Sequence, residues 1–286
     1  MILGFADYQQ QGEALAKALA CPFALIEIHR FPDGESKLTV PQALPEQVIL
    51  CRSLNQPNDK LIELLLATQT LRAQGVRHLT LVAPYLCYMR QDIAFHPGEA
   101  VSQRIIGQFL AEQFDKVVTV DPHLHRIERL DQAIIGREAI ALASAALMGQ
   151  FLRQHTQQPL LLGPDEESAQ WVRAIAEPAG LDWAVASKHR LGDREVEILL
   201  PERDYAAQAV VLVDDMISTG HTLINVARQL RAHGAKQIDT LVTHALCDES
   251  TLQALQQAGI THVWSSDSIP HPTNAVPLAA LLASAC

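Results

Sequence analysis

The sequence contains one segment that combines a strand, a loop and a helix start: VVLVDDMISTGHT, residues 210–222. The four apolar residues 210–213 predict a buried strand, and two carboxylates, Asp214 and Asp215, follow it at the edge of the sheet. Hydroxyls and unobstructed backbone N–H groups come next, at Ser218, Thr219, Gly220 and Thr222. Such groups at a helix N-terminus form an anion cradle, and acids beside them accept hydrogen bonds from vicinal hydroxyls. The segment therefore predicts a site for a phosphorylated sugar.

The same segment has a plainer interpretation, in which Ser218 or Thr219 only caps a helix that follows a strand. Two adjacent acids at the end of a buried strand would repel each other without a ligand between or beside them. This repulsion favours the binding interpretation.

Strands and helices alternate on both sides of this segment. The clearest apolar strands are 48–51, 79–83, 117–120, 160–162, 210–213 and 238–243. Amphipathic helices are expected near 57–74, 100–113, 141–154, 166–177, 220–233 and 248–258. The alternation is typical of βαβ units that build a mostly parallel sheet flanked by helices, which places the chain in the α/β class.

The two halves of the chain share a weak internal echo. Residues 79–84 end a strand in a proline and residues 117–121 end one in an acid, and residues 160–164 and 210–214 repeat that order. Two copies of one open α/β unit would give this pattern, although parallel strands resemble one another in general. We expect two similar domains, 1–140 and 141–286, and leave open that the last helix packs back on the first.

Composition limits the classes of function. The 286 residues carry a net charge of -10 and no block of basic residues, which argues against a nucleic-acid partner or a membrane surface. No apolar run reaches the roughly 20 residues that a membrane span needs. Five single cysteines without a C-x-x-C pair fit neither a disulfide framework nor a structural zinc site, so we expect a cytoplasmic protein.

Segment 210–222 resembles the ribose-5-phosphate loop shared by type I phosphoribosyltransferases and ribose-phosphate pyrophosphokinases. The resemblance implies that Asp214 and Asp215 hold the ribose hydroxyls. It assigns the 5-phosphate to Ser218, Thr219, Gly220 and Thr222. The family usually has a second glycine after Gly220, whereas this chain has His221.

Four segments of the first half resemble motifs of the pyrophosphokinases, which make phosphoribosyl diphosphate (PRPP), and not of the transferases that use it. They are 30–35, 52–61, 84–92 and 121–123. The resemblance implies ATP contacts for Phe31, Asp33, Glu35, Arg90, Gln91, Asp92 and His123. Taken alone, Pro32-Asp33-Gly34 is typical of a tight turn, the tyrosines near Arg90 of packing, and His123 of a turn histidine.

The resemblance also implies a metal and a catalytic pair. Pro164-Asp165 resembles a motif whose Asp ligates or orients magnesium, so Mg²⁺ is expected near His123 and Asp165, although Glu166-Glu167-Ser168 stand where the family has small residues. Lys188 and Arg190, expected after a strand over 183–187, resemble the catalytic Lys-x-Arg at the start of a loop. Charged residues after a strand are usually only solvated, so their place in the order of motifs carries this assignment.

The resemblance runs from about residue 30 to residue 272 and implies two phosphoribosyltransferase-type domains. The expected reaction transfers the β,γ-diphosphoryl group of ATP to the anomeric hydroxyl of ribose 5-phosphate, giving PRPP and AMP. In this family Phe31, Asp33 and Glu35 complete the adenine pocket of a neighbouring subunit, which implies a homo-oligomer of at least two chains. The alternatives are a paralogue that is non-catalytic or altered in specificity, and a PRPP-using transferase.

Overall fold

The computed structural model describes residues 1–190 and 196–286, the side chains of 189, 190, 196 and 197 excepted. The chain divides into two units. The first comprises Met1–Leu142 with Ser268–Pro270 and Leu278–Cys286, and the second comprises Ala143–Asp267 with His271–Pro277. No helix in the part of the chain that is described is both long and apolar enough to span a bilayer.

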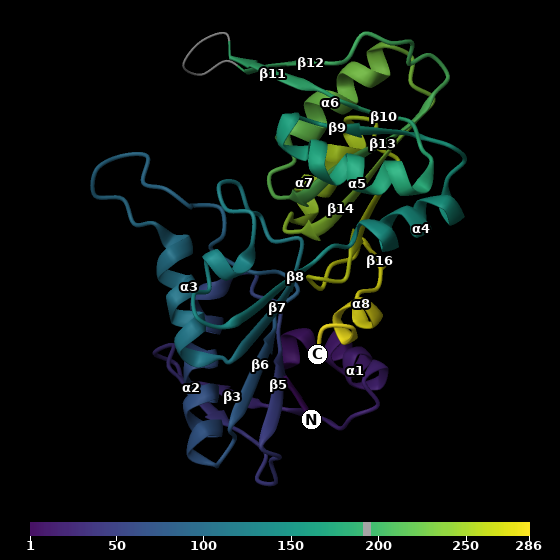
Figure 1. Ribbon diagram of the computed structural model, residues 1–286. Coiled ribbons are helices and arrows are strands. Elements are labelled where there is room, and N and C mark those ends of the chain that lie inside the picture. The colour runs from purple at the N-terminus through teal and green to yellow at the C-terminus, as the bar shows by residue number, and fades with distance from the viewer. Residues whose placement is uncertain (191–195) are drawn as a thin grey trace. The chain divides into compact units, whose positions relative to one another are not determined.

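The first unit is built on a six-stranded parallel sheet with the order β2-β1-β5-β6-β7-β8. Its strands are β1 (Ile2–Gly4), β2 (Phe23–Leu25), β5 (Gln47–Cys51), β6 (His78–Val82), β7 (Lys116–Val120) and β8 (Glu138–Leu142). The helices are α1 (Gln9–Ala18), α2 (Pro57–Ala73), α3 (Ser102–Gln113) and α8 (Ala279–Ala283). Helices α2 and α3 cover one face of the sheet, and α8 packs against α1 on the other (Figure 1). A separate antiparallel hairpin joins β3 (Glu27–Arg30) to β4 (Ser36–Thr39).

The second unit repeats this plan with the order β10-β9-β13-β14-β15-β16. Its strands are β9 (Leu160–Gly163), β10 (Trp183–Val185), β13 (Ala209–Ile217), β14 (Gln237–Ala245), β15 (His262–Ser266) and β16 (Asn274–Val276). The helices are α4 (Ala145–His155), α5 (Ala169–Ala179), α6 (His221–Ala232) and α7 (Glu249–Gln257). A hairpin of β11 (Ser187–Arg190) and β12 (Val196–Leu199) takes the place of β3 and β4.

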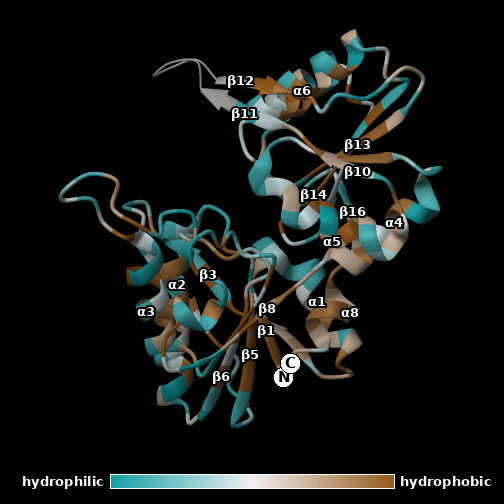
Figure 2. Ribbon diagram, turned by 45° about the horizontal axis from the view of Figure 1, so that its top comes forward, coloured by the Kyte–Doolittle hydropathy of each residue, from teal (hydrophilic) through white to brown (hydrophobic). Residues whose placement is uncertain are grey.

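The continuous apolar runs are explained by burial on both faces of each sheet. Leu160 and Leu162 of β9 pack with α6 and α7, while Leu161 between them packs with α4 and α5. Since successive side chains of a strand point to opposite faces, every residue of such a strand must be apolar. In Figure 2 the sheet strands are largely hydrophobic, whereas most helices carry both hydrophilic and hydrophobic residues.

The predicted α/β class is confirmed, and the predicted strands and helices agree with the structure closely. The alignment of the two halves was wrong. Strand β6 takes the place in its sheet that β14 takes in the second, whereas residues 160–163 form β9, the counterpart of β1. Fully buried parallel strands read alike, so a proline or an acid at their ends does not fix their order. Lys188 also differs from expectation because it lies inside β11, not in a loop after a strand.

Candidate active site

The predicted sugar-phosphate segment lies at the carboxyl end of a central strand of the second unit. Strand β13 is longer than predicted and pairs with β14 as far as Ile217, so Asp214 and Asp215 belong to the strand itself. Asp215 is 3 % exposed, and its backbone N–H donates to Oδ1 of the half-buried Asp214 at 2.9 Å. Both acids are therefore held on rigid backbone.

A three-residue loop, 218–220, separates β13 from α6. Gly220 is the N-cap of α6 with φ +69°, and a Cβ there would lie 3.0 Å from Cγ2 of Thr251. Both the left-handed backbone and the close approach favour glycine. Ser218 and Thr219 are exposed beside it, so their hydroxyls are open to an anion. The first N–H groups of a helix have no partner within the helix, which makes this helix start a further site for negative charge.

A third acid approaches this pair. Asp165 is the N-cap of a short 3₁₀ helix, Glu166–Ser168, and its carboxylate accepts the Ser168 N–H at 3.2 Å. Burial raises the pKa of Asp214 well above its ordinary value, and the neighbouring carboxylates of Asp215 and Asp165 raise it further. Three carboxyl groups therefore lie close together at this strand end, and their mutual repulsion disfavours the ionised form of Asp214.

Lys188 supplies a cation to this acidic cluster. Lys188 lies on β11, and its ammonium group donates to Oδ2 of Asp165. The two side chains share a cavity of about 480 Å³. Its polar lining comprises Asp165, Glu166, Glu167, Lys188, His221, Thr222 and Asn225.

His221 connects this cavity to a second one. It also lines a hollow of about 450 Å³ together with Ser218, Thr219, Asp248, Ser250 and Thr251. It is the first residue of α6, where the backbone is helical, so it does not need the conformational freedom of the glycine that the family usually has there. The structure thus brings together all the predicted residues of the second unit that it describes. The side chain of Arg190 lies outside the described residues.

The predicted ATP residues of the first unit lie on three loops. Phe31, Asp33 and Glu35 occupy the exposed tip of the β3–β4 hairpin. The segments 84–92 and 121–123 follow the neighbouring strands β6 and β7 at one edge of the sheet.

Two side-chain contacts anchor the loops that follow β6 and β7. Asp92 pairs with Arg126 at 2.6 Å, which ties these loops to each other. Gln91 accepts a hydrogen bond from Ser102 at the start of α3, at 3.2 Å. His123 packs edge-on against His125 with ring centroids 4.2 Å apart.

The sequence motifs did not reveal an ionic cluster beside these loops, built around the buried pair Arg52 and Glu63. It consists of Asp7, Arg30, Arg52, Asp59, Lys60 and Glu63. Within the Leu-rich α2, Glu63 looks like a residue of an exposed face, and it stands beside buried Leu64. A single charged residue beside an apolar stripe of a helix is normally exposed, so the sequence pattern gives no indication that Glu63 is buried.

Comparison with known proteins identifies the family. Residues 1–113 match the N-terminal domain of ribose phosphate pyrophosphokinase, and residues 132–279 match the phosphoribosyl transferase domain. The ribose-phosphate pyrophosphokinase of Methanopyrus kandleri is 33 % identical over 100 % of this chain and 98 % of its own length. The chain belongs to the ribose-phosphate pyrophosphokinase family. A second member, from Thermococcus kodakarensis, is 31 % identical over 88 % of this chain and 89 % of its own length.

The fold of the family agrees with the structure. The crystal structure of phosphoribosylpyrophosphate synthetase from Mycobacterium smegmatis has a TM-score of 0.85 and covers 100 % of this chain and 96 % of its own, at 21 % identity. Ribose-phosphate pyrophosphokinases therefore provide both the sequence match and the fold match. The first unit corresponds to a domain that the alternative, a PRPP-using transferase, does not require.

Proposed function

We propose that this chain transfers the β,γ-diphosphoryl group of ATP to the anomeric hydroxyl of ribose 5-phosphate, producing PRPP and AMP. The observation that carries the proposal is the convergence of Asp165, Asp214 and Asp215 with Lys188 beside an open helix N-terminus. Family membership supports the same reaction.

Each part of this site has a role in the proposal. Asp214 and Asp215 accept hydrogen bonds from the ribose hydroxyls. The 5-phosphate is held by the hydroxyls of Ser218, Thr219 and Thr222 and by the backbone at Gly220. The rigid strand and the short loop fix the distance between these two sets of groups, so the sugar is oriented with its anomeric hydroxyl toward the transferring phosphates.

Phosphoryl transfer is catalysed mainly by positioning and by stabilisation of charge, and an acidic chain needs local cations for this. We assign that role to Lys188 and Arg190. Mg²⁺ binds through one or two carboxylates beside substrate phosphates, and Asp165 offers such a carboxylate next to the sugar acids, so the residues present fit this ion. Bound Mg²⁺ supplies neutralisation of the substrate phosphates. We propose Asp165 as the Mg²⁺ ligand of the second unit. For the first unit, His123 is still the predicted Mg²⁺ ligand.

The nucleotide side of the proposal uses the first unit. Phe31, 41 % exposed, offers a face for stacking on adenine, with Asp33 and Glu35 beside it to read the base. Arg90, Gln91, Asp92 and His123 are assigned to the rest of ATP. As the hairpin is proposed to complete a neighbouring subunit's pocket, the active form is a homo-oligomer, and light scattering after size exclusion should find no active monomer.

The expected compartment is the cytoplasm. All five cysteines, which lie in the described part of the chain, are free thiols. Free thiols are the normal state in a reducing compartment. We propose no nucleic-acid or membrane partner, since the net charge of -10 disfavours both.

One assay tests the reaction directly. Purified protein is incubated with ATP, Mg²⁺ and ribose 5-phosphate, and the products are followed by phosphorus NMR. PRPP and AMP are expected. ADP would indicate a monophosphoryl kinase, and the absence of any product would favour the non-catalytic paralogue.

A second experiment tests the role of Lys188. If its ammonium group stabilises charge on the transferring phosphates, Lys188→Ala should lower kcat by about 10²–10³ with a smaller effect on binding of ribose 5-phosphate. Lys236→Ala, at an exposed lysine after α6, is the matched control. An unchanged kcat in Lys188→Ala would remove Lys188 from the catalytic residues.

A further inference from the structure

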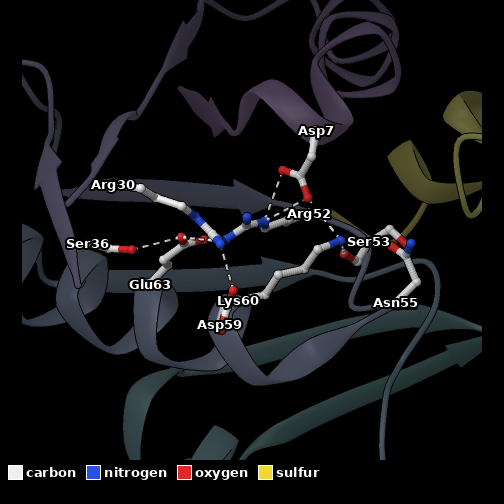
Figure 3. A network of polar contacts seen from close by, with 9 residues as sticks. All are labelled: Asp7, Arg30, Ser36, Arg52, Ser53, Asn55, Asp59, Lys60 and Glu63. Atoms are coloured by element: carbon white, nitrogen blue, oxygen red, sulfur yellow. Dashed lines mark hydrogen bonds and ion pairs between the residues drawn. The ribbon is translucent and has the colours of Figure 1, made fainter. Parts of the chain in front are cut away.

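Glu63 of α2 is a buried acid that the proposed reaction does not use. It is 1 % exposed, and both of its carboxylate oxygens are engaged. Oε1 accepts from Nη2 of Arg30 at 3.2 Å and from the hydroxyl of Ser36 at 3.1 Å. Oε2 lies 2.7 Å from Nη1 of Arg52, on the opposite side (Figure 3).

The two donors to Oε1 come from opposite strands of one hairpin. Arg30 is the last residue of β3, Ser36 is the first of β4, and the two are register partners. They form the last pair before the loop 31–35. Arg30 also donates to Asp59, one turn earlier on α2, at 2.7 Å. Helix α2 therefore binds the hairpin at the base of its loop, through Asp59 and Glu63.

The loop beyond this pair is exposed at every residue. It is closed on itself by hydrogen bonds from the Phe31 N–H to the Glu35 carbonyl at 2.8 Å and from the Gly34 N–H to the Phe31 carbonyl at 2.9 Å. Because the loop is internally braced, its direction depends on the pair at its root. Ile28 and Leu38, the second pair from the root, pack on the core and place the hairpin, but they lie farther from the loop.

The far side of Glu63 is equally fixed. Arg52 is 4 % exposed, stacks over the ring of Phe5 at 4.2 Å and donates to Asp7 at 3.1 Å. Lys60 reaches Asp7 at 2.9 Å and the Ser53 carbonyl at 2.8 Å. A buried ion pair adds little net stability compared with apolar side chains of the same size. In this chain the pair holds the carboxylate of Glu63 between Arg52 and the hairpin.

We propose that Glu63 is a positioning residue for the nucleotide donor: through Arg30 and Ser36 it sets the direction in which the loop 31–35 presents Phe31, Asp33 and Glu35 to the base. The inference rests on the proposed function, which assigns these three residues to adenine. Glu63 itself does not touch substrate. Its effect belongs to nucleotide binding and base preference, and not to the sugar-phosphate site.

The test cuts the hairpin from Glu63 while the buried pair with Arg52 stays in place. The double variant Arg30→Met/Ser36→Ala removes both donors to Oε1, and Arg30 is exposed enough for the chain to fold without it. We expect the KM for ATP to rise about tenfold, as loss of charge-assisted hydrogen bonds lets the loop move. The preference for ATP over GTP in kcat/KM should fall, while the KM for ribose 5-phosphate and kcat stay near parental values.

Two controls separate positioning from stability. Ser36→Thr keeps a hydroxyl and should retain the parental KM for ATP. Arg129→Met removes an exposed ion pair with Asp131, at 2.6 Å in the same unit, and should leave every kinetic constant unchanged. A double variant with a lower melting temperature but an unchanged KM and base preference would reduce Glu63 to a structural role and overturn the inference.

Phe31→Ala, measured in parallel, separates the assignment of Phe31 to adenine from the positioning role of Glu63. If it leaves the KM for ATP unchanged, the adenine assignment fails and the inference fails with it. If it raises that KM while the double variant does not, the assignment stands and the inference about Glu63 alone is wrong.

Discussion

The two units carry residues of opposite charge at one equivalent position of the same fold. Leu3 pairs with Leu50 in the first sheet, and Leu162 pairs with Leu212 in the second. The glycines that follow Leu3 and Leu162 accept equivalent hydrogen bonds, from Ile26 and Ala186. Two residues after Leu50 stands Arg52, and two residues after Leu212 stands Asp214. The end of the central strand is therefore cationic in the first unit and acidic in the second.

The charged groups around this position also differ between the two units. In the first unit Asp7 lies beside Arg52 and Lys60. Burial would raise the pKa of Asp7, but these two cations outweigh it, and the pKa falls below its ordinary value. In the second unit, burial and two further acids raise the pKa of Asp214 well above its ordinary value. Cations thus hold the acid of the first unit in its charged form, whereas the grouped acids of the second unit disfavour the charged form of Asp214, a perturbation that is common at functional sites. This contrast supports the proposal that the sugar-phosphate site lies in the second unit.

The largest expected effect on stability comes from removing Arg52, the cation at the strand end of the first unit. Arg52→Met leaves the buried carboxylate of Glu63 without its nearest cation, and it should lower the free energy of unfolding by about 3–5 kcal/mol. Urea unfolding measures this. The double variant Arg52→Met/Glu63→Met should recover most of the loss, because an apolar pair of similar size replaces the ion pair.

Arg72→Met is the matched control for this experiment. It removes a more exposed pair with Asp115, 2.7 Å apart, and should cost about 1 kcal/mol or less. Equal losses in Arg52→Met and Arg72→Met would show that the strand end of the first unit is no more dependent on charge balance than its surface.

A smaller effect, of opposite sign for stability, is expected in the second unit. Asp214→Asn/Asp215→Asn removes acceptors for the ribose hydroxyls and should weaken binding of ribose 5-phosphate by about a hundredfold, or about 2.7 kcal/mol. The same change relieves the repulsion at the strand end, so the ligand-free protein should unfold at a higher temperature. Calorimetric titration and thermal unfolding measure the two quantities. Parental affinity would show that the sugar assignment is wrong.

The sequence predicted the central strands of both sheets and the six helices α2 to α7, because burial on both faces demands apolar runs. It missed β1, β2, β8, β15 and β16 and the helices α1 and α8. It also did not predict the hairpins, since β3 and β4 are short and largely exposed, and EIHR and SKLT hold few apolar residues. The cluster around Asp214 was expected at one sheet edge, but the pairing of Asp165 with Lys188 required the second hairpin. The role of Glu63 depends on contacts between residues far apart in the chain, which no local pattern records.

The smallest effects concern how the two units start the helix after the central strand. Both α2 and α6 begin from a left-handed residue, which is Gln56 with φ +50° in the first unit and Gly220 with φ +69° in the second. Gln56→Gly should therefore stabilise the chain by up to about 1 kcal/mol, since glycine adopts this backbone without strain. Gly220→Ala should destabilise it by about 1–2 kcal/mol, through backbone strain and the contact with Thr251.

A third glycine separates the backbone cost from the cost to the site. Gly180 ends α5 at φ +66°, and a Cβ there would meet nothing within 4 Å. Gly180→Ala should lose about 1 kcal/mol of stability and bind ribose 5-phosphate like the parent. Gly220→Ala should weaken that binding as well, because the added methyl group displaces the loop that holds the 5-phosphate. If the two variants bind equally well, Gly220 serves the start of α6 alone and the anion cradle must lie elsewhere along the helix start.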